Sequence, residues 1–231
     1  MNAETGSSLD RARRRIAYFS VAACAMLALT LVGFGDNLFT NVGQPSNFDP
    51  KFIAHGLTSL AWMVLLVVQS TLIGAGNPRL HRKLGLAGLI IALGVTLSTL
   101  YLFVVLWKGW DHMGAEAKAN RLLLPAYALL VGLAFANRHR PALHKRLILL
   151  GSFCMLGPVL ARTFDPLFVP FIEGWPESAI ETMFWPYFLG IWSAFFASLL
   201  AYDVATMRRP AAVTLGGIAL FAACWLIAVG T

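Results

Sequence analysis

Long apolar runs separated by short polar joints make up most of the chain. Each run is apolar on all sides rather than along one stripe, which is typical of a helix surrounded by lipid. A helix needs roughly 20 apolar residues to cross the hydrocarbon core. The pattern predicts seven helices near residues 16–34, 51–73, 84–107, 121–137, 145–162, 183–204 and 212–229. The predicted fold class is therefore all-α, a polytopic membrane bundle of seven transmembrane helices over residues 16–231 that follows a basic segment, 1–15.

Proline and glycine mark the joints between these runs. The fourth run is the shortest, and Pro125 near its expected start is compatible with the first turn of a helix. The segment 166–186 and the following Tyr187 combine four prolines with six aromatic side chains. Aromatic residues are enriched at the membrane interface, so we expect this segment to form a lid or a re-entrant turn on the outer surface.

Composition supports the membrane prediction. Only 13% of residues are charged, whereas a soluble domain has about a quarter, and the mean hydropathy is +0.69. Cys24, Cys154 and Cys224 stand singly in apolar runs without CxxC spacing. They are expected to be small buried apolar residues, and no disulfide or metal site is predicted.

The distribution of charge predicts the orientation. If the joints alternate between two sides, 13 of the 18 Lys and Arg residues fall on one side and 8 of the 11 acids on the other. Positively charged loops stay in the cytoplasm, so we expect a cytoplasmic N-terminus and an outer C-terminus in a bacterial inner membrane. Because the basic clusters adjoin the bilayer, no nucleic-acid partner is expected.

A short segment that recurs 63 residues later in the chain supports this arrangement. The segment Pro78-x-Leu-His-Arg-Lys-Leu84 recurs as Pro141-x-Leu-His-Lys-Arg-Leu147. Both copies form a basic turn that opens a helix, so the second and third predicted helices are related to the fourth and fifth by a parallel repeat.

The basic turns are predicted to bind membrane lipids, since anionic lipid attracts each nearby cation by about 1 kcal/mol. The head-group residues are Arg79, His81, Arg82, Lys83, His144, Lys145 and Arg146. An anion or nucleotide site built around His81 and His144 is the alternative, although no phosphate-binding loop accompanies them.

Polar and amphipathic residues follow one face of the second helix. His55, Trp62 and Gln69 are spaced by seven, a step that drifts only about 20° around a helix. Such a stripe faces the bundle rather than lipid. It either fixes packing through interhelical hydrogen bonds or forms one wall of a polar cavity.

Four further ionisable residues are predicted to lie at the depth of His55, near the outer ends of their helices: Asp36, Arg162, Asp165 and Glu181. They form either a salt-bridged cap or, with His55, an outward-facing pocket for a small molecule, a lipid or a partner membrane protein. At the inner end, Asp203 is expected to pair with Arg208 and Arg209.

Several functional classes can be weighed against these residues. A retinal protein needs a lysine in its last helix, and residues 212–229 contain none. A haem b protein needs paired histidines and would have to combine His55 with His81 and His144. A transporter would show broken helices around a central site, and Pro158 and Gly190 are modest hints of such breaks. The preferred prediction is a non-enzymatic membrane protein with a polar pocket and no required cofactor.

The stretches His55 to Gly85, His139 to Leu147 and Tyr202-Asp203 resemble a family of proteobacterial multi-pass inner-membrane proteins of unknown function with LHRKLG-type cytoplasmic turns. The resemblance spans the second to the sixth predicted helix and implies fold and location only. A histidine common in that family after the Tyr-Asp pair is missing from Arg208 to Thr214.

Overall fold

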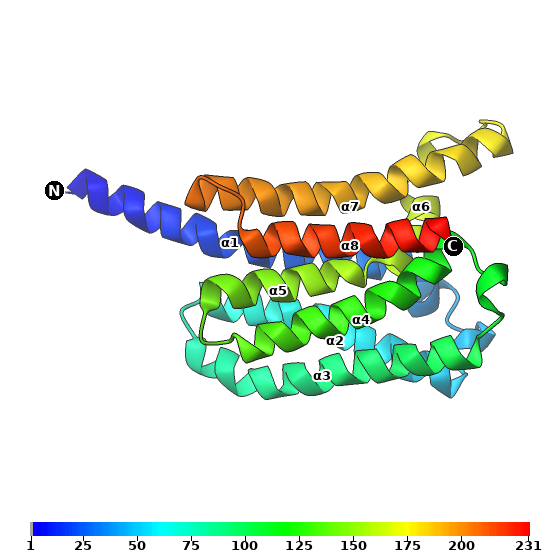
Figure 1. Cartoon of the computed structure of the whole chain (residues 1–231), viewed down its shortest axis with the longest axis horizontal. Coiled ribbons are helices and arrows are strands. Elements are labelled where there is room, and N and C mark those ends of the chain that lie inside the picture. The colour runs from blue at the N-terminus through cyan, green and yellow to red at the C-terminus, as the bar shows by residue number, and fades with distance from the viewer. Residues whose placement is uncertain (1) are drawn as a thin grey trace.

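A computed structural model describes residues 2–231, with side chains from residue 17 onward, and every regular element in that range is helical (Figure 1). The α-helices are α1 (Asn2–Gly33), α2 (Pro50–Gly74), α3 (Pro78–Val105), α4 (Ala115–Ala136), α5 (Pro141–Cys154), α6 (Gly157–Leu167), α7 (Glu177–Met207) and α8 (Ala212–Gly230). Short helical turns cover Asp36–Thr40, Pro45–Asn47, Trp110–His112 and Val169–Phe171.

The described helices make the chain a multi-pass membrane protein. Five of them, α2, α3, α4, α7 and α8, are long and apolar enough to cross a bilayer. The consecutive pair α5 and α6 qualifies as a sixth span if it is counted as one bent unit. In α1, the apolar part among the residues whose side chains are described is the shorter stretch Ala17–Gly33.

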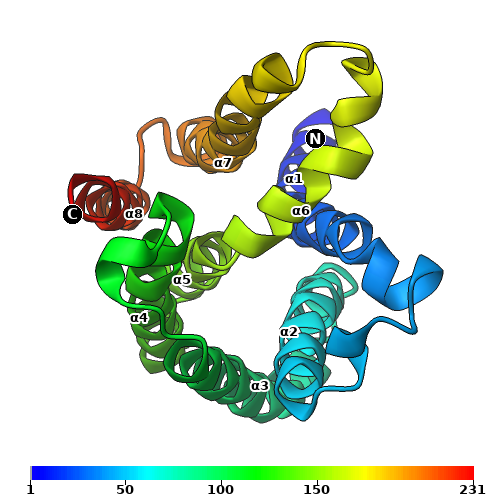
Figure 2. The same cartoon turned by 90° about the vertical axis from the view of Figure 1, so that its right-hand side faces the viewer.

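The helix predicted over 145–162 is in fact two helices. It breaks after Cys154 and bends by 62° before continuing as α6. Pro158 lies in the first turn of α6. In a continuous helix its ring would clash with the backbone carbonyl of the residue four positions earlier. The bend carries α6 across the bundle toward α1 and α7 (Figure 2).

Four other helices start clearly earlier than predicted: α1 begins at Asn2 rather than 16, and α3, α4 and α7 each begin six residues early. α4 begins at Ala115 rather than 121, so Pro125 lies inside the helix and not in its first turn. α3 begins at Pro78 rather than 84, because the Asn77 side chain caps it by accepting a hydrogen bond from the Leu80 amide at 3.1 Å. α7 begins at Glu177, so residues 177–186 of the predicted 166–186 loop belong to this helix.

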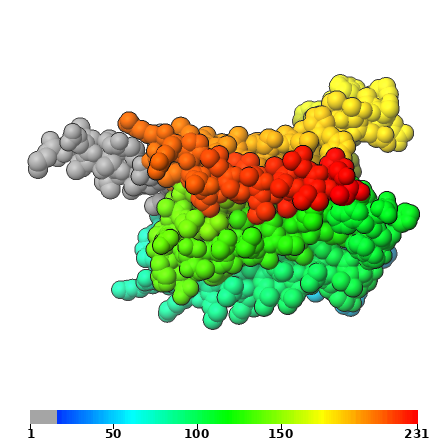
Figure 3. Space-filling model, viewed as in Figure 1, coloured from blue at the N-terminus to red at the C-terminus, as the bar shows by residue number. Residues whose placement is uncertain are grey.

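The two ends of the bundle differ in their connections. The turns 74–78, 136–141 and 207–212 lie at the same end as the N-terminus, whereas the longer connections and the C-terminus lie at the other (Figure 1). The basic turns therefore share one end, which we call the basic end. On the face seen in Figure 3, α8 lies between α7 on one side and α4 and α5 on the other.

Candidate functional site

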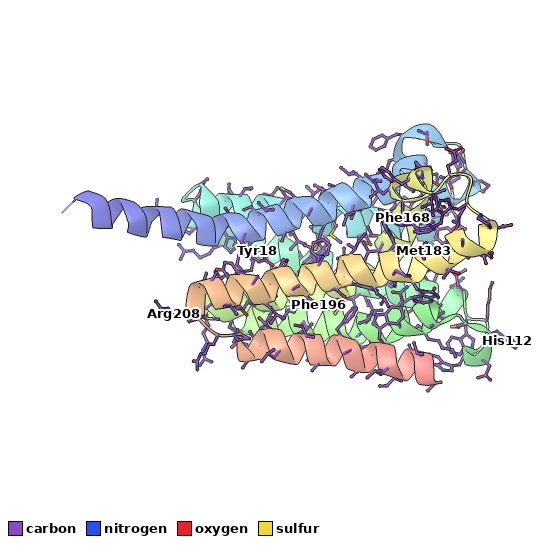
Figure 4. All side chains as sticks on the ribbon, turned by 90° about the horizontal axis from the view of Figure 1, so that it is seen from above. Tyr18, His112, Phe168, Met183, Phe196 and Arg208 are labelled. Atoms are coloured by element: carbon purple, nitrogen blue, oxygen red, sulfur yellow. The ribbon has the colours of Figure 1, made fainter. Side chains whose placement is uncertain are left out.

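A cavity of about 520 Å³ lies toward the end opposite the basic end. Side chains from α1 to α6 and from the connection between α3 and α4 line it. Lys108 and His112 of that connection are exposed, so the cavity reaches the surface there. Figure 4 shows His112 at the end of the molecule opposite Arg208.

His55 on α2 lines this cavity and is held by α3. Its Nδ1 atom lies 3.3 Å from Thr99 Oγ1 and 3.5 Å from Ser98 Oγ. Thr99 already donates its hydroxyl hydrogen to the Val95 carbonyl at 2.6 Å. Nδ1 must therefore carry the proton in its bond to Thr99, which leaves Nε2 of the neutral ring as an acceptor.

Trp62 lines the cavity about 10 Å further along α2 than His55. The indole is buried, donates from Nε1 to Ser152 Oγ at 3.2 Å and packs edge-on against Tyr127. Between His55 and Trp62, the buried Ser59 hydroxyl also lines the cavity and has no hydrogen-bond partner among the residues described. The predicted stripe thus forms a wall of the cavity at His55 and Trp62.

The third residue of the stripe, Gln69, lies elsewhere. It is two turns closer to the basic end than Trp62 and is not part of the cavity lining. Its backbone carbonyl lies 3.3 Å from Nδ1 of His81. Equal spacing placed the three residues on one face, but the cavity ends before that face does.

The four ionisable residues expected near His55 do not line the cavity either. Arg162 lies 4.0 Å from Asp36 and donates to Asn37 at 3.2 Å, with all three near the surface. Asp165 and Glu181 are exposed and form no ion pair within the described part of the chain. The salt-bridged cap therefore consists of Asp36 and Arg162 alone.

Sequence reasoning missed the basic residues of the cavity, Lys108 and Arg121, together with His112. The predicted start of the fourth helix at residue 121 placed Arg121 at the membrane edge. Because α4 begins at Ala115, Arg121 lies almost two turns inside the helix and reaches the cavity.

At the basic end, Asp203 pairs with Arg146 and not with Arg208 or Arg209. Arg146 donates to Asp203 Oδ1 from Nη2 at 2.6 Å and from Nε at 2.8 Å. Thr214 Oγ1 and the Ala211 amide donate to Oδ2 at 2.6 and 3.0 Å. Both charged side chains are buried, so Arg146 faces the bundle interior and not the lipid head groups predicted for it.

The other basic-turn residues divide into two groups. Arg79, Arg82 and Lys83 are exposed, as a head-group contact requires. Lys145 is half-buried and donates to the Tyr202 hydroxyl at 2.8 Å.

One of the three predicted cysteine placements also differs, because Cys24 is exposed.

His81 and His144 hold equivalent positions in the repeat and make equivalent contacts. Each donates from Nδ1 to a carbonyl of the preceding helix, His81 to Gln69 and His144 to Ala134 at 2.8 Å. Their ring centroids are 6.4 Å apart. His55 is 14 residues from Gln69, or about 20 Å along α2, so one haem cannot use all three histidines.

Fold and cavity together define a multi-pass helical membrane protein with a pocket that opens at one end of the bundle. Comparison of the chain with family models, with curated proteins and with solved structures gives no match. The resemblance to the proteobacterial membrane family stays a prediction.

Proposed function

We propose that the chain crosses a bacterial inner membrane seven times, with its N-terminus in the cytoplasm. Seven crossings result if α1 and the bent pair α5 and α6 each span once, in addition to the five long helices. An odd number of crossings agrees with termini at opposite ends of the bundle (Figure 1). The basic turns that share the N-terminal end support a cytoplasmic location for that end.

In this orientation the cavity opens on the outer side, and we propose that it binds a small amphipathic molecule. One observation carries the proposal: His55, Ser59 and Trp62 line a 520 Å³ space, a size within the range of about 300–1,000 Å³ typical of ligand pockets. His55 contacts Thr99 and Ser98 rather than Ser59, so this pair does not form a base-activated nucleophile. These contacts favour binding over catalysis.

A cavity-filling substitution tests this function. Ser59→Phe should fill the space beside His55, whereas Leu57→Phe, at a side chain 63% exposed on the same helix, is the matched control. Binding of ten-carbon amphiphiles is measured as the rise in melting temperature of protein in maltoside micelles, because a ligand stabilises the folded state by mass action. We expect wild type and Leu57→Phe to be stabilised and Ser59→Phe not. Equal stabilisation of all three proteins would place the binding outside the cavity.

Transport is a second candidate, favoured by one observation. Pro158, at the break between α5 and α6, lines the same cavity, and broken helices beside a central site are typical of transporters. Uptake of a radiolabelled amphiphile into proteoliposomes above the rate of empty liposomes would support this candidate. Binding without such uptake would leave the cavity as a receptor site.

A further inference from the structure

We propose that the cavity selects amphipathic molecules with an acidic head group, such as a carboxylate, and that Arg121 binds this group. The inference rests on the proposed binding function and adds the chemical class of the ligand. It follows from the charges that line the cavity, the bonding of Arg121 and the apolar character of the remaining walls.

The charged residues that line the cavity are all basic. Eight of the 11 acids belong to the same end of the molecule as the cavity, yet no Asp or Glu lines it. Lys108 and Arg121 do. The described residues place no carboxylate within 4.0 Å of the basic groups of Lys108 or Arg121. Neither cation therefore has an ion-pair partner among the described residues, and both are available to a ligand anion.

The Arg121 guanidinium is fixed in place with bonding capacity left over. Nη1 donates to the Ala117 carbonyl at 3.1 Å and Nη2 to the Phe103 carbonyl at 3.4 Å. The group lies 4.7 Å from the centroid of the Phe103 ring. Its Nε is buried and has no partner among the described residues. A guanidinium has five N–H donors, so an acid group would find a preorganised cation whose remaining hydrogen bonds are unused.

The rest of the lining suits an apolar body. Met63, Val95, Leu102, Leu124 and Val159 come from four different helices and face the same space. Lys108 and His112 mark the surface opening, and buried Trp62 and Met63 lie furthest from it along α2. A ligand held by its head at Arg121 would extend its apolar part toward Trp62.

The test compares three ligands that share a ten-carbon chain: decanoate, decanol and decylamine. Wild type, Arg121→Gln and Lys108→Gln are titrated with each compound at neutral pH in maltoside micelles, and dissociation constants are taken from the shift in melting temperature. Decyl phosphate is a fourth ligand that shows whether any acid head suffices. Arg162→Gln is the matched control, because Arg162 lies at the same end but outside the cavity lining.

We expect wild type to bind decanoate more tightly than decanol and decylamine. Loss of a charge-assisted hydrogen bond should weaken decanoate binding by about tenfold or more in Arg121→Gln, with decanol unchanged and Arg162→Gln like wild type. Lys108, in an exposed connection, provides a second variant if Arg121→Gln fails to fold, and its removal should weaken decanoate specifically. Binding of decanol and decylamine as tight as that of decanoate would overturn the inference and leave the pocket in place. Binding of none of the four compounds would overturn the proposed function itself.

Discussion

At the scale of single residues, the buried carboxylate of Asp203 has the strongest structural consequences. Four donor atoms converge on it, two from Arg146, one from Thr214 and one from the Ala211 amide. In the sequence, an acid next to a basic cluster correctly predicted that Asp203 has a basic partner. The predicted partners were wrong, because they were the arginines nearest along the chain. The pairing joins α5, α7 and α8, and only their packing brings Arg146 to this point.

Asp203→Ala should destabilise the folded bundle by about 3–5 kcal/mol, because the substitution leaves the Arg146 charge buried without a counter-ion. Stability is measured by titration with dodecyl sulfate in mixed micelles. Arg208→Gln removes an exposed charge that the sequence had predicted as a partner of Asp203. This substitution should change stability by less than about 1 kcal/mol. Equal effects of the two substitutions would show that the buried pair contributes no more than the exposed arginine.

At the scale of helices, the sequence predicted that the apolar runs are helical but misplaced several of their ends. The early starts of α3 and α4 follow from local capping and from polar residues that continue the helix beyond the apolar run. The break at Pro158 was visible only as an isolated proline, which membrane helices often tolerate. Whether a proline kinks a helix or divides it depends on the neighbours, here α1 and α7.

The end of α7 contains the one described non-glycine residue with positive φ, Arg208, at φ 60° and ψ 14°. A left-handed conformation costs an L-residue roughly 1–2 kcal/mol and costs glycine almost nothing. Arg208→Gly should therefore stabilise the bundle by up to about 1 kcal/mol, measured by the same dodecyl sulfate titration. Arg209→Gly removes the same charge at a residue with negative φ and should not stabilise.

Two glycines at equivalent positions of the repeat allow close contacts between helices. A Cβ atom on Gly151 of α5 would lie 3.0 Å from Val131 Cγ2 on α4, and one on the equivalent Gly88 of α3 would lie 3.1 Å from Leu65 Cδ2 on α2. Gly151→Leu should cost about 1–3 kcal/mol by overpacking this contact. Gly132→Leu is the control, because the space beside Gly132 is open. Thermal unfolding followed by tryptophan fluorescence compares them, and equal melting temperatures would contradict the close contact.

At the scale of the whole molecule, the sequence predicted a helical membrane bundle and the grouping of its basic turns, because both depend on composition and alternation along the chain. It predicted His55 and Trp62 as parts of one wall for the same reason. It did not predict the basic side of the cavity, since Lys108 and Arg121 reach it only through the true start of α4 and the fold of the connection before it. Periodicity identifies a face of one helix, whereas a pocket needs the relative positions of several.

Orientation is the property of the whole molecule on which the outward-facing pocket depends. In a chain whose native cysteines are replaced by alanine, single cysteines at Lys108 and Thr231 should react with a membrane-impermeant maleimide in intact spheroplasts. Cysteines at Lys83 and Arg209, in the exposed basic turns, should react only after permeabilisation, because positively charged turns stay cytoplasmic. Since Thr231 and the N-terminus lie at opposite ends of the bundle, labelling of Thr231→Cys also tests the odd number of crossings. Reaction of Lys83→Cys in intact spheroplasts would show that the protein has the opposite orientation. The cavity would then open on the cytoplasmic side, and its ligand would have to come from inside the cell.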